Sequence, residues 1–459
     1  MGENQISRRS FLKRSAGTLV GTLLFPYFVP ASALGKNGFT VPSDRITMGC
    51  IGLGGQGTYN MRNFIQQPDA QVIALCDVDR GSTDYGILNA GSYFGLEPAL
   101  KRALDEYARQ NRPVNTESIS LYTDFRELLA REDIDAVTVC TPDHWHGLIT
   151  IAAAKAGKDI YCEKPLVNSI PEGRAVCEAV KCFGRVLQTG SHERSNDSVR
   201  FACELVRNGR IGELRTIEIN MPNSDQHHKW ILSHNQPQPE MPVPKNLDYD
   251  MWLGPAPWRP YTQNGVHFFW RFILDFGGGE MTDRGAHIID IAQLANNTDN
   301  SGPIEIKGVG KAPKTGIYDC FMDYQFECWY ANGVRLIGSS KGERGLKLVG
   351  SEGWIFIHIH GGRLEAEPKS LLREKIGPDD IHIGRSPGHH RNFLDCVKTR
   401  NLPVAHAEIG HRTATICHLL NIAYLTGRPI KWDPVKEHVV NDPEVQRLVN
   451  RPMRTPWHV

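Results

Sequence analysis

Three glycines and an aspartate have the spacing of a phosphate-binding turn. Gly52, Gly54 and Gly57 follow one apolar run and open a stretch with helical periodicity, and a second apolar run ends in Asp77. This is a strand, a glycine turn, a helix and a strand, with an acidic residue about 20 positions beyond the turn. The pattern favours a dinucleotide-binding βαβ unit over the alternative interpretation, a glycine turn that binds no ligand.

Each residue type in this unit has a physical role. Gly52 permits the tight turn, Gly54 lets the backbone approach a pyrophosphate, and Gly57 allows close packing of helix on strand. The amide groups that open the helix then face the anion. Asp77 would accept hydrogen bonds from a ribose and repel a 2′-phosphate, which favours NAD over NADP. Arg80 follows closely and leaves NADP open as the less favoured cofactor.

Two further strands end in polar loops. The apolar run 136–140 precedes the loop from Thr141 to His146, and the run 159–162 precedes Glu163, Lys164 and Pro165. In an open parallel sheet, ligands bind at the carboxyl ends of the strands, so we expect both loops to line the nicotinamide side of a cleft. Lys164 could instead be an ordinary surface lysine that follows a strand.

A third group of chemically active residues follows three consecutive glycines. Asp283 and His287 are four positions apart in a stretch that predicts an amphipathic helix, so they share one face, with Asp290 one turn further on. Two plainer interpretations exist. Asp283 could only cap the helix, and His287 could be a histidine at the edge of the core.

These motifs resemble one enzyme family. Gly52–Gly57, Thr141–His146 and Glu163–Pro165 match, in order and spacing, the motifs of the glucose–fructose oxidoreductase, inositol dehydrogenase and rhizopine catabolism protein (Gfo/Idh/MocA) family. The resemblance implies an α/β chain with a doubly wound Rossmann domain and a C-terminal α/β domain that has an open, largely antiparallel sheet. We expect the first over residues 42–190 and the second over residues 191–459.

The resemblance also implies roles for individual residues. It implies a catalytic lysine at Lys164 with Asp283 and His287 opposite it, and we interpret His287 as the general base. It implies a homo-oligomer formed through the open sheet. The residues expected to bind the cofactor are Gly52, Gly54, Gln56, Gly57, Asp77, Thr141, Pro142, His146, Glu163 and Lys164.

Paired histidines raise the question of a metal site. None of the pairs forms an H-E-x-x-H or a Cys/His zinc pattern, and residues 354–360 alternate as a strand would. Hydride transfer to nicotinamide needs no Lewis acid. The sequence therefore predicts no metal, and His227, His228 and His390 remain candidate substrate contacts.

The rest of the sequence predicts further secondary-structure elements. Residues 222–270 are rich in Pro and Trp and are interpreted as a loop or arm, in which the Trp rings either stack on sugars or pack internally. Alternating runs within residues 303–366 predict a sheet, and residues 391–398 and 405–425 predict helices.

Composition and the N-terminus restrict the setting. The 459 residues carry 52 Lys and Arg against 51 Asp and Glu, a formal charge of +1, which argues against a nucleic-acid partner.

Arg8 and Arg9 precede an apolar stretch over about residues 16–29 and then a small-residue site at Ala33. Residues 1–33 therefore predict a twin-arginine signal peptide, handled by the twin-arginine export machinery, and a bacterial periplasmic protein. Retention of this segment as an anchor is the alternative.

Three functions remain in competition. The first is an NAD-dependent oxidoreductase with a tightly held cofactor, which acts on a secondary hydroxyl of a sugar, polyol or glycoside, with carbon 3 of a pyranose as one candidate position. The second is glycoside cleavage through a transient keto-sugar, which relatives of this family perform. The third is a non-catalytic binding protein or sensor. Lys164 together with Asp283 and His287 counts against the third, because a sensor needs no proton-transfer groups.

Overall fold

A six-stranded parallel sheet positions the predicted cofactor residues. In the computed structural model, which describes residues 40–85, 93–112 and 114–459, the strand order is β3-β2-β1-β4-β5-β6. This is the order of a Rossmann sheet. The strands are β1 (Ile46–Ile51), β2 (Ala70–Cys76), β3 (Ser120–Tyr122), β4 (Ala136–Val139), β5 (Asp159–Cys162) and β6 (Leu187–Thr189).

Helices cover both faces of this sheet. Apolar side chains of α2, α3 and α11 pack with Met48 and Cys50 on one face, and those of α4, α5 and α6 pack around Ile51 and Val137 on the other. The parallel strands are therefore buried on both sides, which explains their continuous apolar runs. The helices are α2 (Gly55–Ile65), α3 (Leu96–Arg109), α4 (Phe125–Leu129), α5 (Asp143–Lys155), α6 (Ile170–Cys182) and α11 (His389–Thr399).

The C-terminal part contains a nine-stranded mixed sheet, in the order β13-β12-β11-β7-β10-β9-β8-β14-β15. Only the pair of β7 and β10 is parallel among these described strands, so the expected largely antiparallel sheet is confirmed. The strands are β7 (Leu214–Asn220), β8 (Glu305–Lys311), β9 (Asp323–Trp329), β10 (Arg335–Ser339), β11 (Gly345–Gly350), β12 (Trp354–Ile357), β13 (Leu364–Glu367), β14 (Ile430–Asp433) and β15 (His438–Val439).

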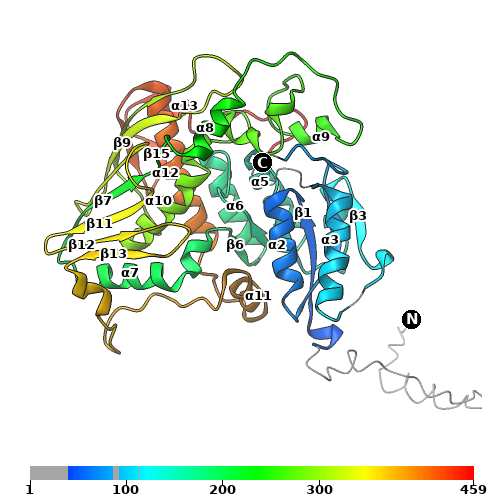
Figure 1. Cartoon of the computed structure of the whole chain (residues 1–459), viewed down its shortest axis with the longest axis horizontal. Coiled ribbons are helices and arrows are strands. Elements are labelled where there is room, and N and C mark those ends of the chain that lie inside the picture. Colours follow the sequence, from blue (N-terminus) through cyan, green and yellow to red (C-terminus); the bar gives the residue numbers. More distant parts are fainter. Residues whose placement is uncertain (1–39, 86–92, 113) are drawn as a thin grey trace, which may run out of the picture. The chain divides into compact units, whose positions relative to one another are not determined.

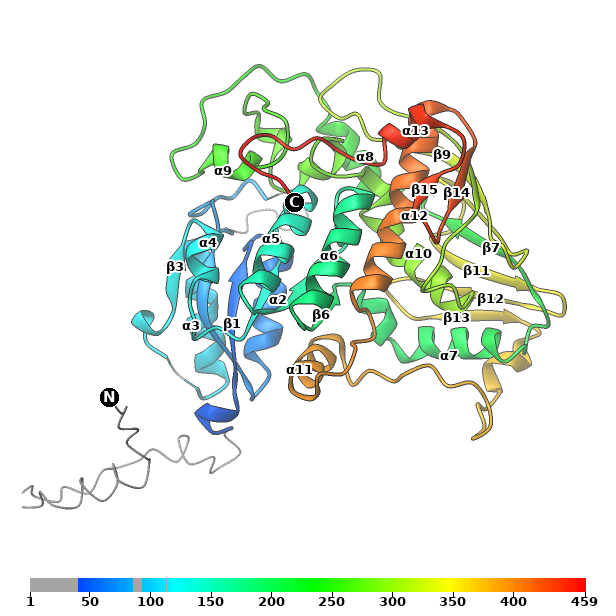
Figure 2. The same ribbon diagram turned by 180° about the vertical axis from the view of Figure 1, so that it is seen from behind.

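Three helices pack on one face of this second sheet and connect it to the first. They are α7 (Asp197–Arg207), α10 (Arg284–Ala295) and α12 (Ala407–Thr426), whose apolar side chains share one core with the strands. Figure 1 shows α10 and α12 beside the strands, and Figure 2 shows α12 running next to α6. Residues 46–459 form one compact unit. Short helices α8 (Gln226–Ser233), α9 (Tyr249–Leu253) and α13 (Pro443–Arg447) complete the structure over the described residues.

Several sequence expectations need correction. The helix after β4 begins at Asp143, so His144 and His146 lie in its first turn and not in a loop. The segment 222–270 contains α8 and α9, because its aromatic side chains build a small core of their own. Strand β12 ends at Ile357, and the alternation over residues 358–360 belongs to a turn in which His360 has a φ of 68°.

The predicted signal peptide lies outside the described residues. Of the N-terminal segment, the short turn η3 (Pro42–Asp44) is described, and the Arg45 side chain donates to the carbonyl of Thr40. Among the helices that the structure describes, none has both the length and the apolar character needed to cross a bilayer.

The packing at Gly57 generates a stability prediction. A Cβ atom at this position would lie 1.8 Å from the carbonyl oxygen of Gly52, so Gly57→Ala must displace backbone. We expect the variant to lose about 1–3 kcal/mol of unfolding free energy in urea titrations. Gly384→Ala, where a Cβ meets nothing within 4 Å, serves as the control. Equal stability of the two variants would show that the turn is not tightly packed.

Candidate active site

The glycine turn forms one end of a large pocket. Gly52 has a φ of +82°, and a Cβ there would lie 2.6 Å from the backbone of Cys140, so only glycine fits. Gly54 is the N-cap of α2. Because glycine has no side chain to accept a hydrogen bond, the backbone amides of the first helical turn stay uncapped where they line the pocket. The turn therefore has the geometry of a cradle for a pyrophosphate.

Asp77 lies immediately after β2, at the edge of this cradle. Its Oδ2 accepts a hydrogen bond from the Leu53 amide at 2.5 Å, and its Oδ1 accepts one from the Asp79 amide at 2.9 Å. Burial raises the pKa of Asp77 to about 7, although these amides favour the charged form. Arg80 lies at the surface, 4.0 Å from Glu97, and is not among the pocket residues.

Glu163 ties the end of β5 to helix α2. Its Oε1 accepts from Gln56 Nε2 at 3.1 Å and from Asn60 Nδ2 at 2.8 Å, and the carboxylate is buried. Gln56 and Glu163 both line the pocket, but they are engaged with each other. These hydrogen bonds fix the end of β5 relative to the glycine turn that opens α2.

The residues after β4 form the adjoining wall. The His146 ring is buried, with Nδ1 2.6 Å from the carbonyl oxygen of Pro165 and Nε2 2.8 Å from that of Thr141. Burial lowers the pKa of His146. The ring thus braces the two loops that carry Thr141, Pro142 and Lys164, while the buried Oγ1 of Thr141 has no hydrogen-bond partner. That hydroxyl is available to a ligand in the pocket.

Lys164 and Asp283 form an ion pair across the pocket. Lys164 Nζ donates to Asp283 Oδ1 at 2.7 Å and to its carbonyl oxygen at 3.0 Å. Arg271 Nε lies 3.4 Å from the same carboxylate. Burial alone would raise the pKa of Asp283, but the two cations outweigh it and hold that pKa well below its usual range. Asp283 occupies the N-cap position without making a cap hydrogen bond, so the plain capping interpretation is wrong.

His287 lies one turn further along α10, within the same pocket. Its side chain is buried, and its Nδ1 has no hydrogen-bond partner. Burial lowers the pKa of His287 well below its ordinary value, and the neighbouring Lys164 adds to that shift. The imidazole is therefore neutral at neutral pH, and its Nδ1 is available for a hydrogen bond to a ligand.

The remainder of α10 differs from the expected amphipathic helix. All residues from Arg284 to Ala295 are buried, because the helix lies between the sheet and α12. Asp290 does not line the pocket. It binds Arg194 at 2.8 Å and Thr413 at 3.1 Å, which makes it a structural residue.

One pocket of about 750 Å³ contains every residue that the sequence predicted to be catalytic or to bind the cofactor. Sequence reasoning placed Asp143 in a loop expected to line the cleft but gave it no role of its own, and it missed other polar members of the pocket because no motif marks them. Asp143 accepts from Thr282 at 3.4 Å, and burial raises its pKa to about 8. The missed residues include Arg271, Arg284, Arg344, His192 and His360. Of the three candidate histidine contacts, His227 lines the pocket, whereas His228 and His390 do not.

Family models match both parts of this architecture. The model described as the oxidoreductase family, C-terminal alpha/beta domain, of the Gfo/Idh/MocA group matches residues 195–459, and its NAD-binding Rossmann fold model matches residues 87–191. The chain belongs to this oxidoreductase family. The family assignment accounts for the Rossmann sheet and for the second sheet, and it supports a nicotinamide cofactor in the pocket.

Individual relatives of the family share part of the chain. A glycosyl hydrolase family 109 protein of Shewanella baltica is 26% identical over 222 residues, 46% of this chain and 45% of that protein. Levoglucosan dehydrogenase of Pseudarthrobacter phenanthrenivorans is 26% identical over 259 residues, 52% of this chain and 56% of that protein. The chain thus spans about half the length of the curated relatives it matches.

Solved structures of other oxidoreductases share the fold. Aldose-aldose oxidoreductase from Caulobacter crescentus, complexed with glycerol, superimposes with a TM-score of 0.56 at 19% identity, over 84% of this chain and 99% of that one. Levoglucosan dehydrogenase in complex with NADH and levoglucosan superimposes with a TM-score of 0.56 at 19% identity, over 84% of this chain and 98% of that one.

The ion pair of Lys164 and Asp283 generates the second prediction. Lys164→Met leaves a mostly buried carboxylate with Arg271 as its remaining cation, so we expect a loss of about 1–3 kcal/mol in urea unfolding at pH 7. The double variant Lys164→Met/Asp283→Asn removes the charge and should recover most of that loss.

Arg385→Met is the control for this experiment, because its pair with Asp197 is largely exposed and should contribute little. If the double variant is no more stable than Lys164→Met, the two side chains are not coupled.

Proposed function

We propose that this protein is an NAD-dependent oxidoreductase that oxidises a secondary hydroxyl of a sugar, polyol or glycoside. The observation that carries the proposal is the position of Lys164, Asp283 and His287 in the pocket that also contains the glycine turn. A binding protein or sensor would not need a charged lysine and a neutral histidine around one pocket.

The residues at the first end of the pocket fit NAD. The amides of the α2 N-terminus and the close-packed glycines would hold the pyrophosphate, Asp77 the adenosine ribose, and the unpartnered Thr141 hydroxyl the nicotinamide side. The chemistry that NAD supplies when bound is the acceptance of a hydride from the carbon that bears the hydroxyl.

The residues at the other end fit the proton and charge changes of such an oxidation. His287 takes the hydroxyl proton, because it is neutral and its Nδ1 has no partner. Lys164 Nζ donates to the oxygen as negative charge develops there. Asp283 keeps Lys164 oriented, since its carboxylate lies 2.7 Å away and remains ionised.

Aromatic and polar side chains together support a carbohydrate substrate. Trp252, Trp270 and Phe268 line the pocket beside Arg271 and His227. Aromatic faces pack on the C–H groups of sugar rings, and charged side chains bind their hydroxyls. The names of the similar proteins, a levoglucosan dehydrogenase and an aldose-aldose oxidoreductase, agree with this substrate class.

Glycoside cleavage through a transient keto-sugar is the second candidate. The similarity to a glycosyl hydrolase family 109 protein favours it. The same hydride transfer begins both reactions, so Lys164 and His287 would serve either. In the cleavage reaction, the ketone would acidify the neighbouring C–H bond, loss of that proton would expel the aglycone by elimination, water would add to the resulting double bond, and the hydride taken up in the first step would return to the ketone.

Product analysis distinguishes the two candidates. Nitrophenyl glycosides and free sugars are incubated with the protein and NAD, and the products are analysed by mass spectrometry. The proposed dehydrogenase yields a keto-glycoside two mass units lighter, with one NADH per product. Release of nitrophenol without net NADH would instead establish cleavage. Neither product from any sugar class would contradict the proposed function.

The third prediction concerns cofactor choice. With Asp77 at the ribose, NAD should bind at least tenfold more tightly than NADP, about 1.4 kcal/mol. Because the pKa of Asp77 is about 7, its charge forms as the pH rises, and the preference should grow between about pH 6 and about pH 8. Asp77→Ala should abolish the preference, and Asp105→Ala on the exposed face of α3 should retain it. Equal affinities for both cofactors in calorimetric titrations of the parent protein would refute this assignment.

The fourth prediction concerns the catalytic residues. Lys164→Ala should abolish turnover while NAD stays bound, and His287→Ala should lower kcat about 10²–10⁴-fold. Lys155→Ala, an exposed lysine at the end of α5, should be unaffected. Parental rates in both site variants, with melting curves that show folded protein, would rule out their roles.

We also propose export of the folded protein with its cofactor. Free NAD is scarce outside the cytoplasm, so an exported enzyme needs a cofactor that is bound before export. The fifth prediction is that protein from the periplasm carries nicotinamide without any addition, and that Arg8→Lys/Arg9→Lys leaves the protein in the cytoplasm. Empty periplasmic protein that needs added NAD would contradict tight binding of the cofactor.

The homo-oligomer through the open sheet stays a prediction. The outer face of that sheet carries half-buried Trp329 and Trp354, whose rings lie under Lys307 and Lys347. Aromatic side chains of this kind are typical of an association surface.

A further inference from the structure

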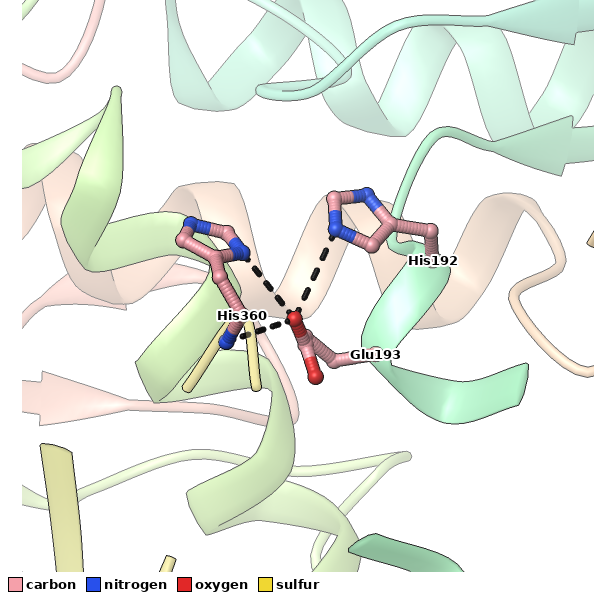
Figure 3. A group of neighbouring side chains, drawn as sticks. All are labelled: His192, Glu193 and His360. Carbon is pink, nitrogen blue, oxygen red and sulfur yellow. Dashed lines mark hydrogen bonds and ion pairs between the residues drawn. The ribbon is translucent and has the colours of Figure 1, made fainter. Parts of the chain in front are cut away.

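A second group of potential ligands lies beside His287, and two of its three members, His192 and His360, line the same pocket. His192 and Glu193 begin the short helical turn η6 (His192–Ser195), which follows β6, and His360 lies in the turn after β12. The three side chains point toward one another in Figure 3. We call them the His192 cluster.

The spacing within the His192 cluster fits a metal ion. Glu193 Oε1 lies 3.0 Å from His360 Nδ1 and 3.5 Å from His192 Nε2, and the ligand atoms of all three residues lie within 4.8 Å of one another. Donor atoms bound to one tetrahedral zinc ion at about 2.0–2.2 Å are about 3.4 Å apart. Small rotations of the two rings would therefore bring all three atoms to one ion.

Unpartnered polar atoms around the cluster indicate a missing ligand. Glu193 is 2% exposed, yet its Oε2 has no hydrogen-bond partner. The buried Nδ1 of His287 also has none, and its ring centroid lies 4.7 Å from that of His192 and 4.9 Å from that of His360. Buried polar atoms without partners are costly, and a cation at this place would satisfy the carboxylate.

The His192 cluster is also accessible, so that both a metal ion and a substrate can reach it. The side chains of His192 and His360 are 48% and 34% exposed, and both line the pocket. A metal held by these two rings and the buried carboxylate would have an open coordination position toward the pocket. This resembles the arrangement of catalytic zinc sites, which use three protein ligands.

We propose that His192, Glu193 and His360 bind one divalent transition metal ion, of which Zn²⁺ fits best, with an open position beside His287. Two imidazoles and one carboxylate suit zinc and its neighbours and do not suit Mg²⁺, which prefers oxygen ligands. The open position takes a water molecule or an oxygen atom of a bound sugar. The binding of the metal does not depend on the proposed oxidation.

The sequence did not reveal this cluster, and its analysis predicted no metal. His360 lies 167 positions from Glu193, so no motif of fixed spacing joins the ligands. The expected strand over residues 354–360 would also have placed His360 in a regular alternation, whereas the observed turn directs it into the pocket.

Metal titration of the untagged, chelator-treated full-length protein tests the proposal. We expect one Zn²⁺ per chain by calorimetry, and one Co²⁺ per chain with visible ligand-field absorption, whereas Mg²⁺ should not compete. His192→Ala and His360→Ala should each weaken Zn²⁺ binding at least tenfold. Because both side chains are exposed, the variants should fold, and circular dichroism checks this. His382→Ala, an exposed histidine that bonds only the carbonyl of Gly377 among the described contacts, should bind as the parent does.

X-ray absorption at the zinc edge gives a readout that needs no variant. The proposal predicts imidazole nitrogen and carboxylate oxygen around the zinc, without sulfur. Failure of the parent protein to bind Zn²⁺ or Co²⁺, unchanged affinity in both histidine variants, or sulfur ligation would overturn the proposal.

Discussion

The ion pair between Lys164 and Asp283 is the interaction on which the site depends. The two residues are 119 positions apart, one at the end of β5 and the other at the start of α10. A mostly buried pair stabilises a protein only when its geometry is well defined, because removing two charges from water is costly. Helix α10 packs against α12, and α12 packs against α6, so the second sheet is fixed to the first. This packing holds Lys164 and Asp283 at the distance and orientation that the ion pair needs.

Burial and the ion pair together set the charges of the groups around the pair. Asp283 has a pKa well below its usual range because Lys164 and Arg271 face it, whereas burial raises the pKa of nearby Asp143 to about 8. Carboxyl groups whose pKa values are displaced in opposite directions within one pocket are typical of acid–base chemistry. His287, which burial keeps neutral, lies in the same pocket.

The sequence predicted the cofactor side of the pocket better than the substrate side. The glycine turn, Asp77 and the loops around Thr141 and Lys164 follow local rules, since short βα units position their own strand ends. Arg271, His192 and His360 could not be predicted, because the first two lie in 3₁₀ turns and the third in the turn after β12, and no periodicity indicates such turns. Helix α10 was misjudged as amphipathic because its second face is covered by α12, which only the tertiary structure determines.

The central claim is that a substrate hydroxyl meets Lys164 and His287 at the point where a nicotinamide faces the carbon that bears it. A crystal structure of the protein with NAD and a glycoside substrate or close analogue tests this most directly. The account predicts a ring hydroxyl oxygen within about 3.2 Å of both Lys164 Nζ and the His287 imidazole, with its carbon next to the nicotinamide. A sugar bound elsewhere in the pocket, or a nicotinamide directed away from Lys164, would contradict the account.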